Sequence, residues 1–79
     1  MEASLAELES GKAAVVKRLD GGDEFRKRLA SLNIRVGKVI RKVTAQPFNG
    51  PVIIEIDHTE ASIGKRMAEK VIVEPLPQG

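Results

Sequence analysis

The sequence predicts a mainly β protein with one substantial helix, folded as a small antiparallel β-barrel. The chain has 79 residues, which suffice for one domain with a single modest core. Short runs rich in Val and Ile are bounded by Gly, Pro and Asn, as strands usually are. The connections after the helix are too short for the crossover helices of a parallel sheet. A small antiparallel barrel remains, because it removes sheet edges by closing on itself.

The N-terminal part of the chain is expected to form a capped turn and then the first strand. Ser4 and Glu7 have the capping-box spacing, in which each side chain bonds the other residue's free backbone N–H. This spacing predicts one short helical turn. The Val-rich run Ala13–Leu19 reads as the first strand, and the Gly-rich turn Asp20–Gly22 follows it.

The only substantial helix is expected over about residues 23–32. Phe25, Leu29 and Leu32 recur at i, i+4 and i+7, which places them on one apolar stripe. Asn33 follows at the position where a residue in the left-handed conformation ends a helix, and Asn is the second choice there after Gly.

The remaining strands are expected in the second half of the chain. A strand over Lys38–Ala45 leads into a loop at residues 46–51, whose Asn49-Gly50 pair is the strongest turn signal. Val52–Asp57 alternates between apolar and mixed positions, as a strand with one buried face does. The rest of the chain is expected to give a return strand over His58–Ile63, a helical turn over Gly64–Lys70, a strand over Val71–Glu74 and a frayed tail at residues 75–79.

These elements predict a five-stranded barrel formed by one domain over residues 1–79. Apolar residues on the helix stripe and on the inward strand positions should make up its core. The residues expected to be buried are Phe25, Leu29, Leu32, Val39, Val52, Ile54, Ile56, Ala68 and Ile72.

The composition excludes several classes of function. The chain has no Cys, one His, no Trp and no Tyr. Thiolate metal sites and Cys nucleophiles are therefore excluded, and stacked aromatic platforms for bases are not expected. No apolar run is long enough to span a bilayer and no signal peptide is recognisable, so we expect a cytoplasmic protein that does not itself span the membrane.

Catalysis is not expected either. Nucleophilic catalysis needs an activated group with a base in hydrogen-bond reach, and adjacent strand residues such as His58 and Thr59 point to opposite faces. The turn Asp20–Gly22 is followed by Asp23, which puts carboxylates where a phosphate loop needs free N–H groups.

Several short motifs, in order along the chain, resemble the FeoA family. They are the turn Asp20-Gly21-Gly22, the helix end Arg28-Leu29-Ala30-Ser31-Leu32-Asn33-Ile34, then Gly37, the strand entry Gly50-Pro51-Val52 and the closing segment Ile63–Val73. The resemblance covers nearly the whole chain. Asn33 and Asn49 stand where the family prefers Gly, and both tolerate positive φ, so the fold is not put in doubt.

The resemblance implies an SH3-like barrel that acts in bacterial or archaeal ferrous-iron uptake. It implies a regulatory accessory protein that binds the cytosolic part of a membrane iron transporter with a G-protein domain, of the FeoB type, at the inner face of the membrane. The same barrel is similar to a domain of iron-dependent repressors. An SH3-like domain of such a regulator system is therefore the alternative, together with a basic nucleic-acid-binding barrel.

The charge pattern indicates a surface for a protein partner. Between residues 26 and 42 the chain carries several cations and no acidic residue, which favours an electrostatic partner. Two apolar residues without an evident core role could anchor the contact. The candidates are Arg26, Lys27, Arg35, Lys38, Arg41, Lys42, Phe48 and Ile53. The alternatives are a solvated face, unspecific contacts with nucleic-acid phosphates, and Phe48 as a lid over the core. No specific recognition of nucleic acid is expected.

One acidic cluster is the candidate metal site. Glu55, Asp57, His58 and Glu60 are the only neighbouring residues with plausible oxygen and nitrogen ligands for Fe²⁺ or another divalent transition metal. The alternative is a polar strand face with a solvated His, which we prefer because one His rarely anchors a tight site. No cofactor is therefore required, and any metal binding is expected to be weak.

Overall fold

The computed structural model describes residues 1–45 and 50–77, in which six strands and two helices are found. In chain order the elements are β1 (Ala3–Ser4), β2 (Ala13–Leu19), α1 (Asp23–Ser31), β3 (Val39–Ala45), β4 (Val52–Ile56), β5 (Thr59–Ile63), α2 (Lys65–Glu69) and β6 (Val71–Pro75). The mainly β fold class that the sequence predicts is confirmed, with the short helical turn at residues 64–70 formed as α2.

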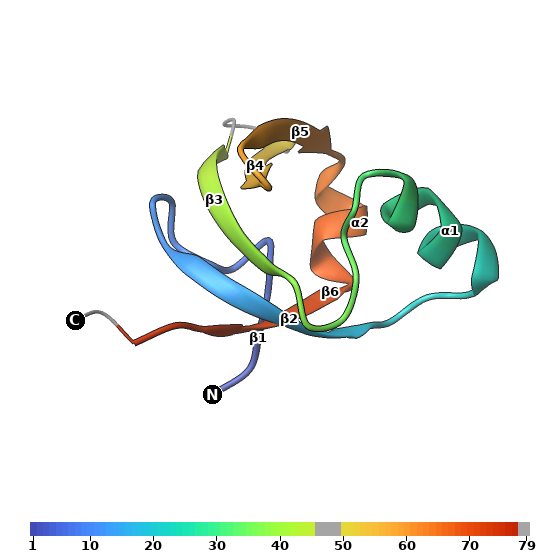
Figure 1. The fold of residues 1–79 in the computed structure, drawn as a ribbon, viewed down its shortest axis with the longest axis horizontal. Coiled ribbons are helices and arrows are strands. Elements are labelled where there is room, and N and C mark those ends of the chain that lie inside the picture. The colour runs from blue at the N-terminus through green and yellow to red at the C-terminus, as the bar shows by residue number, and fades with distance from the viewer. Residues whose placement is uncertain (46–49, 78–79) are drawn as a thin grey trace.

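All six strands belong to one antiparallel sheet with the order β1-β6-β2-β3-β4-β5. The sheet curls so that α2 lies between β4 and β5 on one side and β6 on the other, while α1 stands at the end of the molecule beyond β2 (Figure 1). Register shifts between Val16 and Arg18 and between Lys42 and Thr44 mark two bulges, which increase the local twist of β2 and β3. Strong twist lets so short a sheet coil around its core.

The N-terminal turn forms as expected and also supplies a sixth strand. Ser4 N donates to Glu7 Oε1 at 3.0 Å, and Glu7 N donates to Ser4 Oγ at 3.2 Å, so the capping box is confirmed. Just before this turn, Ala3 and Ser4 pair with Val73 and Ile72 of β6 as β1. The five-stranded count was therefore one strand too low, because a two-residue strand is too short to leave a pattern in the sequence.

The helix α1 ends as the sequence predicts. Asn33 has φ 67°, and its N–H donates to the carbonyl of Ala30 at 2.9 Å. The next residue, Ile34, donates to the carbonyl of Leu29 at 2.9 Å, which completes a Schellman motif. Leu29 and Ile34 are both fully buried, so the hydrophobic contact that accompanies this motif is also present.

Most of the expected core is confirmed, with two corrections. Predicted core residues that are buried are Leu29, Val52, Ile54, Ile56 and Ala68, while Phe25 and Leu32 are partly buried against the core. Val39 was expected inside but is 52% exposed, because Ile40 takes the inward position of β3 and strand neighbours point to opposite faces. Ile72 is only half-buried.

Two element boundaries also differ from expectation. The expected tail is ordered at its start, since Pro75 pairs with Ala14 and Leu76 N donates to the Ala13 carbonyl at 3.0 Å. The β4–β5 hairpin turns at Asp57 and His58, which were expected to lie in strands. Both have positive φ, 52° and 65°, as in a two-residue type I′ turn, where Asp is well tolerated.

Candidate functional site

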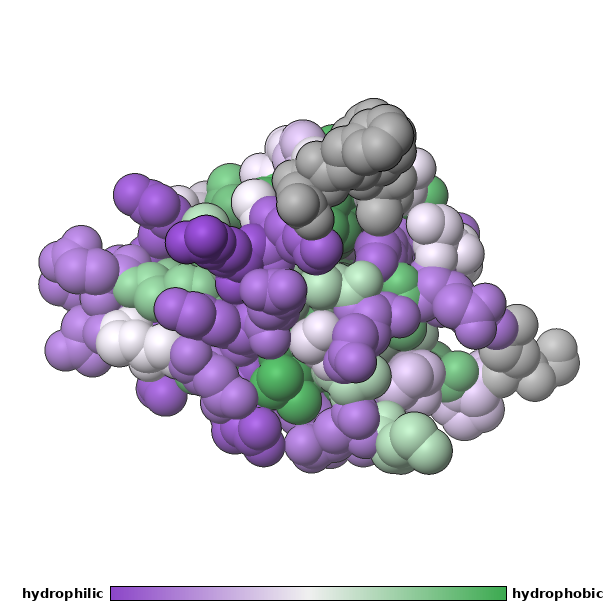
Figure 2. Space-filling view, turned by 180° about the vertical axis from the view of Figure 1, so that it is seen from behind, coloured by the Kyte–Doolittle hydropathy of each residue, from purple (hydrophilic) through white to green (hydrophobic). Residues whose placement is uncertain are grey.

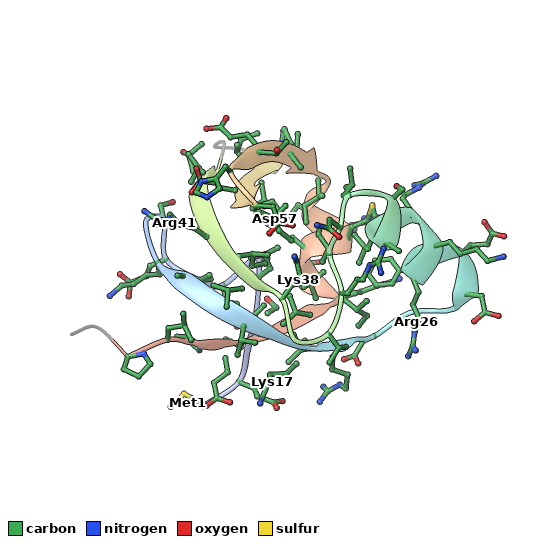
Figure 3. All side chains as sticks on the ribbon, viewed as in Figure 1. Met1, Lys17, Arg26, Lys38, Arg41 and Asp57 are labelled. Atoms are coloured by element: carbon green, nitrogen blue, oxygen red, sulfur yellow. The ribbon has the colours of Figure 1, made fainter. Side chains whose placement is uncertain are left out.

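The basic surface expected from the sequence is divided by the fold, because several of its cations bond to other parts of the chain. Arg26 donates to the carbonyls of Gly21 and Leu19, each at 3.3 Å, and so holds the turn that precedes α1. Lys38 Nζ lies 3.0 Å from Asp57 Oδ1 and 2.8 Å from Asp57 Oδ2. Figure 3 shows Lys38 and Asp57 close together near the middle of the molecule, with Arg26 on the side of α1.

Lys42 is the clearest correction, because its side chain is inside the molecule and not on the partner surface. It is 3% exposed, and its Nζ donates to the carbonyl of Ala6 at 2.8 Å. Lys42 pairs with the buried Ile54 on the inward face of the sheet, two residues after the inward Ile40. Burial lowers the pKa of the Lys42 ammonium, because desolvation disfavours its charged form. This side chain therefore anchors the N-terminal turn.

The other candidates for the partner surface are scattered. Arg41 Nε lies 3.8 Å from Glu55 Oε1 on the outer face of the sheet. Lys27 and Arg35 are exposed, and neither makes an ion pair within the described residues. Ile53 is half-buried, and it pairs with Thr44 of β3 on one side and with Ser62 of β5 on the other. Phe48 lies outside the described residues. The partner role of these residues stays a prediction.

The four candidate metal ligands do not form one donor set. Glu55 and Glu60 face each other across β4 and β5, whereas Asp57 and His58 form the turn beyond them. Asp57 is already engaged by Lys38. Within residues 1–45 and 50–77, no three His, Asp or Glu side chains gather so that they could hold a metal ion.

Asp57 instead connects the hairpin turn to the end of α1. It accepts hydrogen bonds from Lys38 Nζ and from the side-chain amide of Asn33. The bond from Lys38 lowers the pKa of the Asp57 carboxyl, and the bond from Asn33 acts in the same direction. Asn33 thus combines two roles here: its backbone ends the helix and its side chain holds the β4–β5 turn, which Gly at this position could not do.

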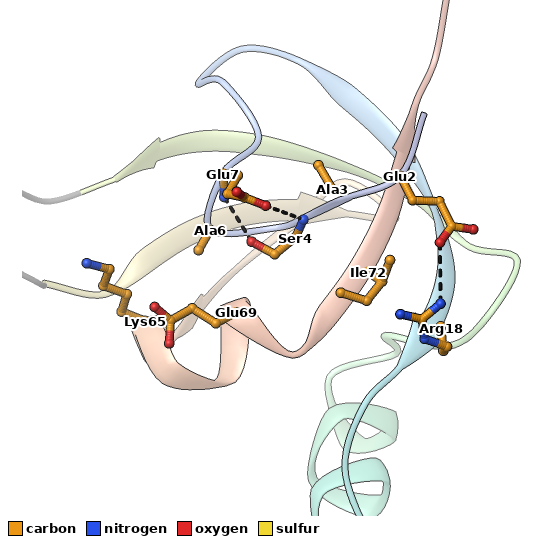
Figure 4. Close-up of a pocket in the computed structure, with 9 residues that line it drawn as sticks. All are labelled: Glu2, Ala3, Ser4, Ala6, Glu7, Arg18, Lys65, Glu69 and Ile72. Atoms are coloured by element: carbon orange, nitrogen blue, oxygen red, sulfur yellow. Dashed lines mark hydrogen bonds and ion pairs between the residues drawn. The ribbon is translucent and has the colours of Figure 1, made fainter.

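One open pocket lies between the N-terminal segment and the start of β6 (Figure 4). It has a volume of about 700 Å³, and its rim carries both carboxylates and cations. Glu2 and Arg18, for example, approach each other to 3.4 Å. The residues that line it are Glu2, Ala3, Ser4, Ala6, Glu7, Arg18, Lys65, Glu69 and Ile72. This mixture of charges selects no particular ligand.

A second groove, which sequence reasoning missed, lies between α1 and α2. It has a volume of about 610 Å³ and is lined by Glu24, Phe25, Lys27, Arg28, Ser31 and Met67. Four of these residues recur at i, i+3, i+4 and i+7 of α1, so this face of the helix was visible in the sequence. The contribution of Met67 was not, because it depends on the packing of α2 beside α1. We call this feature the α1–α2 groove.

Comparison with known proteins establishes the family. The model of the FeoA domain matches residues 3–75. This chain belongs to the FeoA domain family. It is 35% identical over 75 residues to the Fe(2+) transport protein A assigned in Methanocaldococcus jannaschii, a match that covers 95% of this chain and 89% of that protein. The resemblance read from the sequence motifs is therefore confirmed.

A further relative joins a FeoA domain to a transporter. This FeoA-family chain is 36% identical over 70 residues to the Fe(2+) transport protein A/Fe(2+) transporter FeoB fusion protein of Porphyromonas gingivalis. The match covers 89% of this chain and 8% of the fusion protein. In that protein the FeoA-like part and the transporter are therefore one polypeptide.

Solved structures confirm the SH3-like fold. The crystal structure of an iron uptake regulatory protein, FeoA, superposes with a TM-score of 0.88 at 30% identity, covering 96% of this FeoA-family chain and 99% of that one. A manganese-dependent transcriptional repressor also shares the fold, with a TM-score of 0.84 at 21% identity over 95% of this chain and 42% of that one. At that identity the likeness concerns the fold alone.

Neither helix of the described ranges is long and apolar enough to cross a membrane.

Proposed function

We propose that this FeoA-family chain is a non-catalytic accessory protein of ferrous-iron uptake that binds the cytosolic part of the membrane transporter FeoB. The observation that carries the proposal is the fusion protein of Porphyromonas gingivalis, in which a domain 36% identical to this chain is joined to FeoB. Fusion keeps two proteins at a high effective concentration, which is useful when they work in contact. A separate chain of the same family would make that contact by binding, in the cytoplasm at the inner face of the membrane.

The packing of the molecule supports a role at its surface. Apolar side chains of every strand except β1 and of both helices belong to one core cluster. The two pockets described above are open hollows at the surface, and exposed cations line both of them. Exposed cations speed association with an acidic surface and orient the complex.

The test is a direct binding measurement with full-length FeoB from the same organism in nanodiscs. This chain is immobilised, and biolayer interferometry follows binding over a series of salt concentrations. We expect saturable binding that weakens as salt rises, because attraction between exposed charges is screened over about 8–10 Å at physiological ionic strength. Empty nanodiscs serve as the control. Absence of binding at low salt, combined with retention of random duplex DNA in a gel shift, would support the nucleic-acid alternative instead.

We further propose that the chain needs no metal cofactor, and that Fe²⁺ is the cargo of the transporter. The dispersed placement of Glu55, Asp57, His58 and Glu60 supports this, since one His with scattered carboxylates makes at most a weak site. Titration of Zn²⁺ or anaerobic Fe²⁺ into the protein, followed by the ring signals of His58 in NMR, should show no saturation at one equivalent. Stoichiometric saturation that is lost in Glu55→Gln would contradict the proposal.

A further inference from the structure

The α1–α2 groove combines an apolar floor with a basic rim. Its two apolar lining residues are Phe25 and Met67, which we call the floor; both are only partly buried although they pack against the core. Lys27 and Arg28 stand on the α1 side. Lys70, directly after α2, is not one of the lining residues, but its Nζ lies 5.8 Å from the centre of the Phe25 ring, and we count it with the rim for that reason. Figure 2, which shows the molecule from behind, has a small hydrophobic area among hydrophilic residues at the end that carries α1.

The cations of the rim are available to a partner. Within the described residues, Lys27, Arg28 and Lys70 form no ion pair with any carboxylate, in contrast to Lys38 and Arg41. Among the residues that the structure describes, Glu24 is the only acidic one that lines the groove. The rim is therefore net positive, and its natural complement is an acidic chain.

The floor adds a requirement for an apolar group. A hollow of about 610 Å³ is within the size range of roughly 300–1,000 Å³ in which proteins bind small organic groups, so one large side chain fits. Met67 is unbranched and can adapt its shape to such a side chain, while the edge of Phe25 offers an aromatic contact. An apolar anchor surrounded by complementary charge is the usual composition of an interface hot spot.

We propose that the α1–α2 groove binds an acidic segment of the partner that carries one large apolar side chain. The apolar side chain packs between Phe25 and Met67, and the flanking carboxylates face Lys27, Arg28 and Lys70. With the proposed function, on which this assignment of the partner rests, the segment belongs to the cytosolic part of FeoB. Of the cations that the charge pattern of the sequence singles out, this surface contains Lys27 and excludes Arg35 and Arg41.

Two matched double charge reversals distinguish these surfaces. Lys27→Glu/Arg28→Glu alters the groove, and Arg35→Glu/Arg41→Glu makes the same change in net charge outside it. Binding to full-length FeoB in nanodiscs of zwitterionic lipid should weaken about tenfold or more at low salt in the first variant, and less than about threefold in the second. Equal losses, or a larger loss in the second variant, would overturn the assignment of the groove while leaving the proposed function intact.

A third variant tests the apolar floor. Met67→Gln keeps a side chain of similar length and a good helix former, so α2 should persist. We expect it to speed dissociation from FeoB several-fold and to leave the association rate unchanged, because apolar contacts act after encounter. Far-UV circular dichroism and a thermal melt establish that each variant is folded. Wild-type dissociation kinetics in Met67→Gln would contradict a role for the floor.

A synthetic peptide makes the chemistry of the groove testable without FeoB. The probe is a Glu-rich peptide with one central Leu, and the control is the same peptide with that Leu replaced by Ser. The Leu peptide should shift the Met67 methyl signal and the α1 amide signals in NMR. Absence of these shifts at millimolar peptide would overturn the groove as a binding site. If the peptide binds but FeoB does not, the proposed function fails and the groove remains.

Binding of the groove to the membrane surface must also be distinguished from binding to FeoB. Anionic lipid headgroups would also attract the rim cations, but they would leave the floor empty. Binding to empty nanodiscs that contain phosphatidylserine, unaffected by Met67→Gln and equal to binding to discs with FeoB, would show a lipid site and overturn the proposal.

Discussion

Replacing Lys42 should reveal how much a buried lysine contributes to the stability of this small domain. Lys42→Ala removes the ammonium and three methylene groups, and burial of these methylenes is worth about 0.8 kcal/mol each. The cavity left behind adds to this loss, so we expect Lys42→Ala to lower the free energy of unfolding by about 2–4 kcal/mol. A domain of this size is stable by roughly 4–12 kcal/mol, so the variant should still fold.

Lys42→Met is the matched control, because it keeps the apolar stem and removes only the charged end. The lost bond to the Ala6 carbonyl costs about 1.5–3 kcal/mol, but the variant also no longer has to desolvate an ammonium. These effects oppose each other, and we expect Lys42→Met to lie within about 1.5 kcal/mol of the wild type. The assay is urea unfolding followed by far-UV circular dichroism, since the chain has no Trp or Tyr for fluorescence.

The pH dependence of the stability tests the burial of Lys42 independently. Burial lowers the pKa of Lys42 from its ordinary value of 10.5. Between the lowered pKa and 10.5, the unfolded chain binds more protons than the folded one, so wild-type stability must rise with pH relative to Lys42→Met. A loss below about 0.5 kcal/mol in Lys42→Ala, with no pH-dependent difference from Lys42→Met, would refute the burial of this side chain.

Three further changes test the fold. Leu29→Ala should cost about 2.5–5 kcal/mol in urea unfolding, because Leu29 is fully buried; a cost below 1 kcal/mol would contradict its place in the core. Gly21→Ala should destabilise by about 1–3 kcal/mol in a thermal melt, because its Cβ would come within 2.3 Å of the Phe25 ring, and an unchanged melt would show that this contact is absent. Asp57→Asn should be less stable than the wild type at pH 7. Lys38 lowers the pKa of Asp57, so the stability that this carboxylate contributes is present above its unfolded value of about 3.8 and is lost as the pH falls below it. The deficit of the variant should therefore disappear towards pH 2, and a constant deficit would exclude the ion pair as its cause.

The parts of the fold that follow local rules could be read from the sequence. The stripe of Phe25, Leu29 and Leu32 defines the buried side of α1, and the left-handed Asn33 defines its end. Both features depend on residues within one or two helical turns, so local backbone geometry determines them. The family could be recognised for a similar reason, since its motifs mark turns and helix ends that need particular residues.

It was harder to predict which face of the sheet each strand residue occupies. Lys42 was grouped with its neighbouring cations by position in the chain, although strand alternation places it on the same face as Ile40. The alternation was difficult to use because the bulge after Lys42 interrupts it and the outward Val39 is also apolar. In the same way, the two-residue turn at Asp57 was overlooked beside the stronger Asn-Gly signal eight residues earlier.

The candidate site depended on contacts between distant segments and could be predicted only in part. The sequence indicates a basic, partner-binding protein, but it does not show that Lys38 and Arg41 are paired with carboxylates of the β4–β5 hairpin. Nor does it place Met67 beside Phe25, because α1 and α2 are separated by three strands in the chain. Charge patterns therefore predict the kind of partner, whereas the proposed surface is chosen from the fold.

The most direct test of the account is an NMR spectrum of the ¹⁵N-labelled chain recorded with full-length FeoB in nanodiscs. Binding to so large a particle broadens the amide signals at the contact surface first. If FeoB binds the α1–α2 groove, the signals of Lys27 and Arg28 in α1, of Met67 in α2 and of the adjacent Lys70 weaken most, and empty nanodiscs have no effect. A spectrum that stays sharp throughout would contradict binding to FeoB, and loss confined to the outer face of β3 and β4 would contradict the α1–α2 groove.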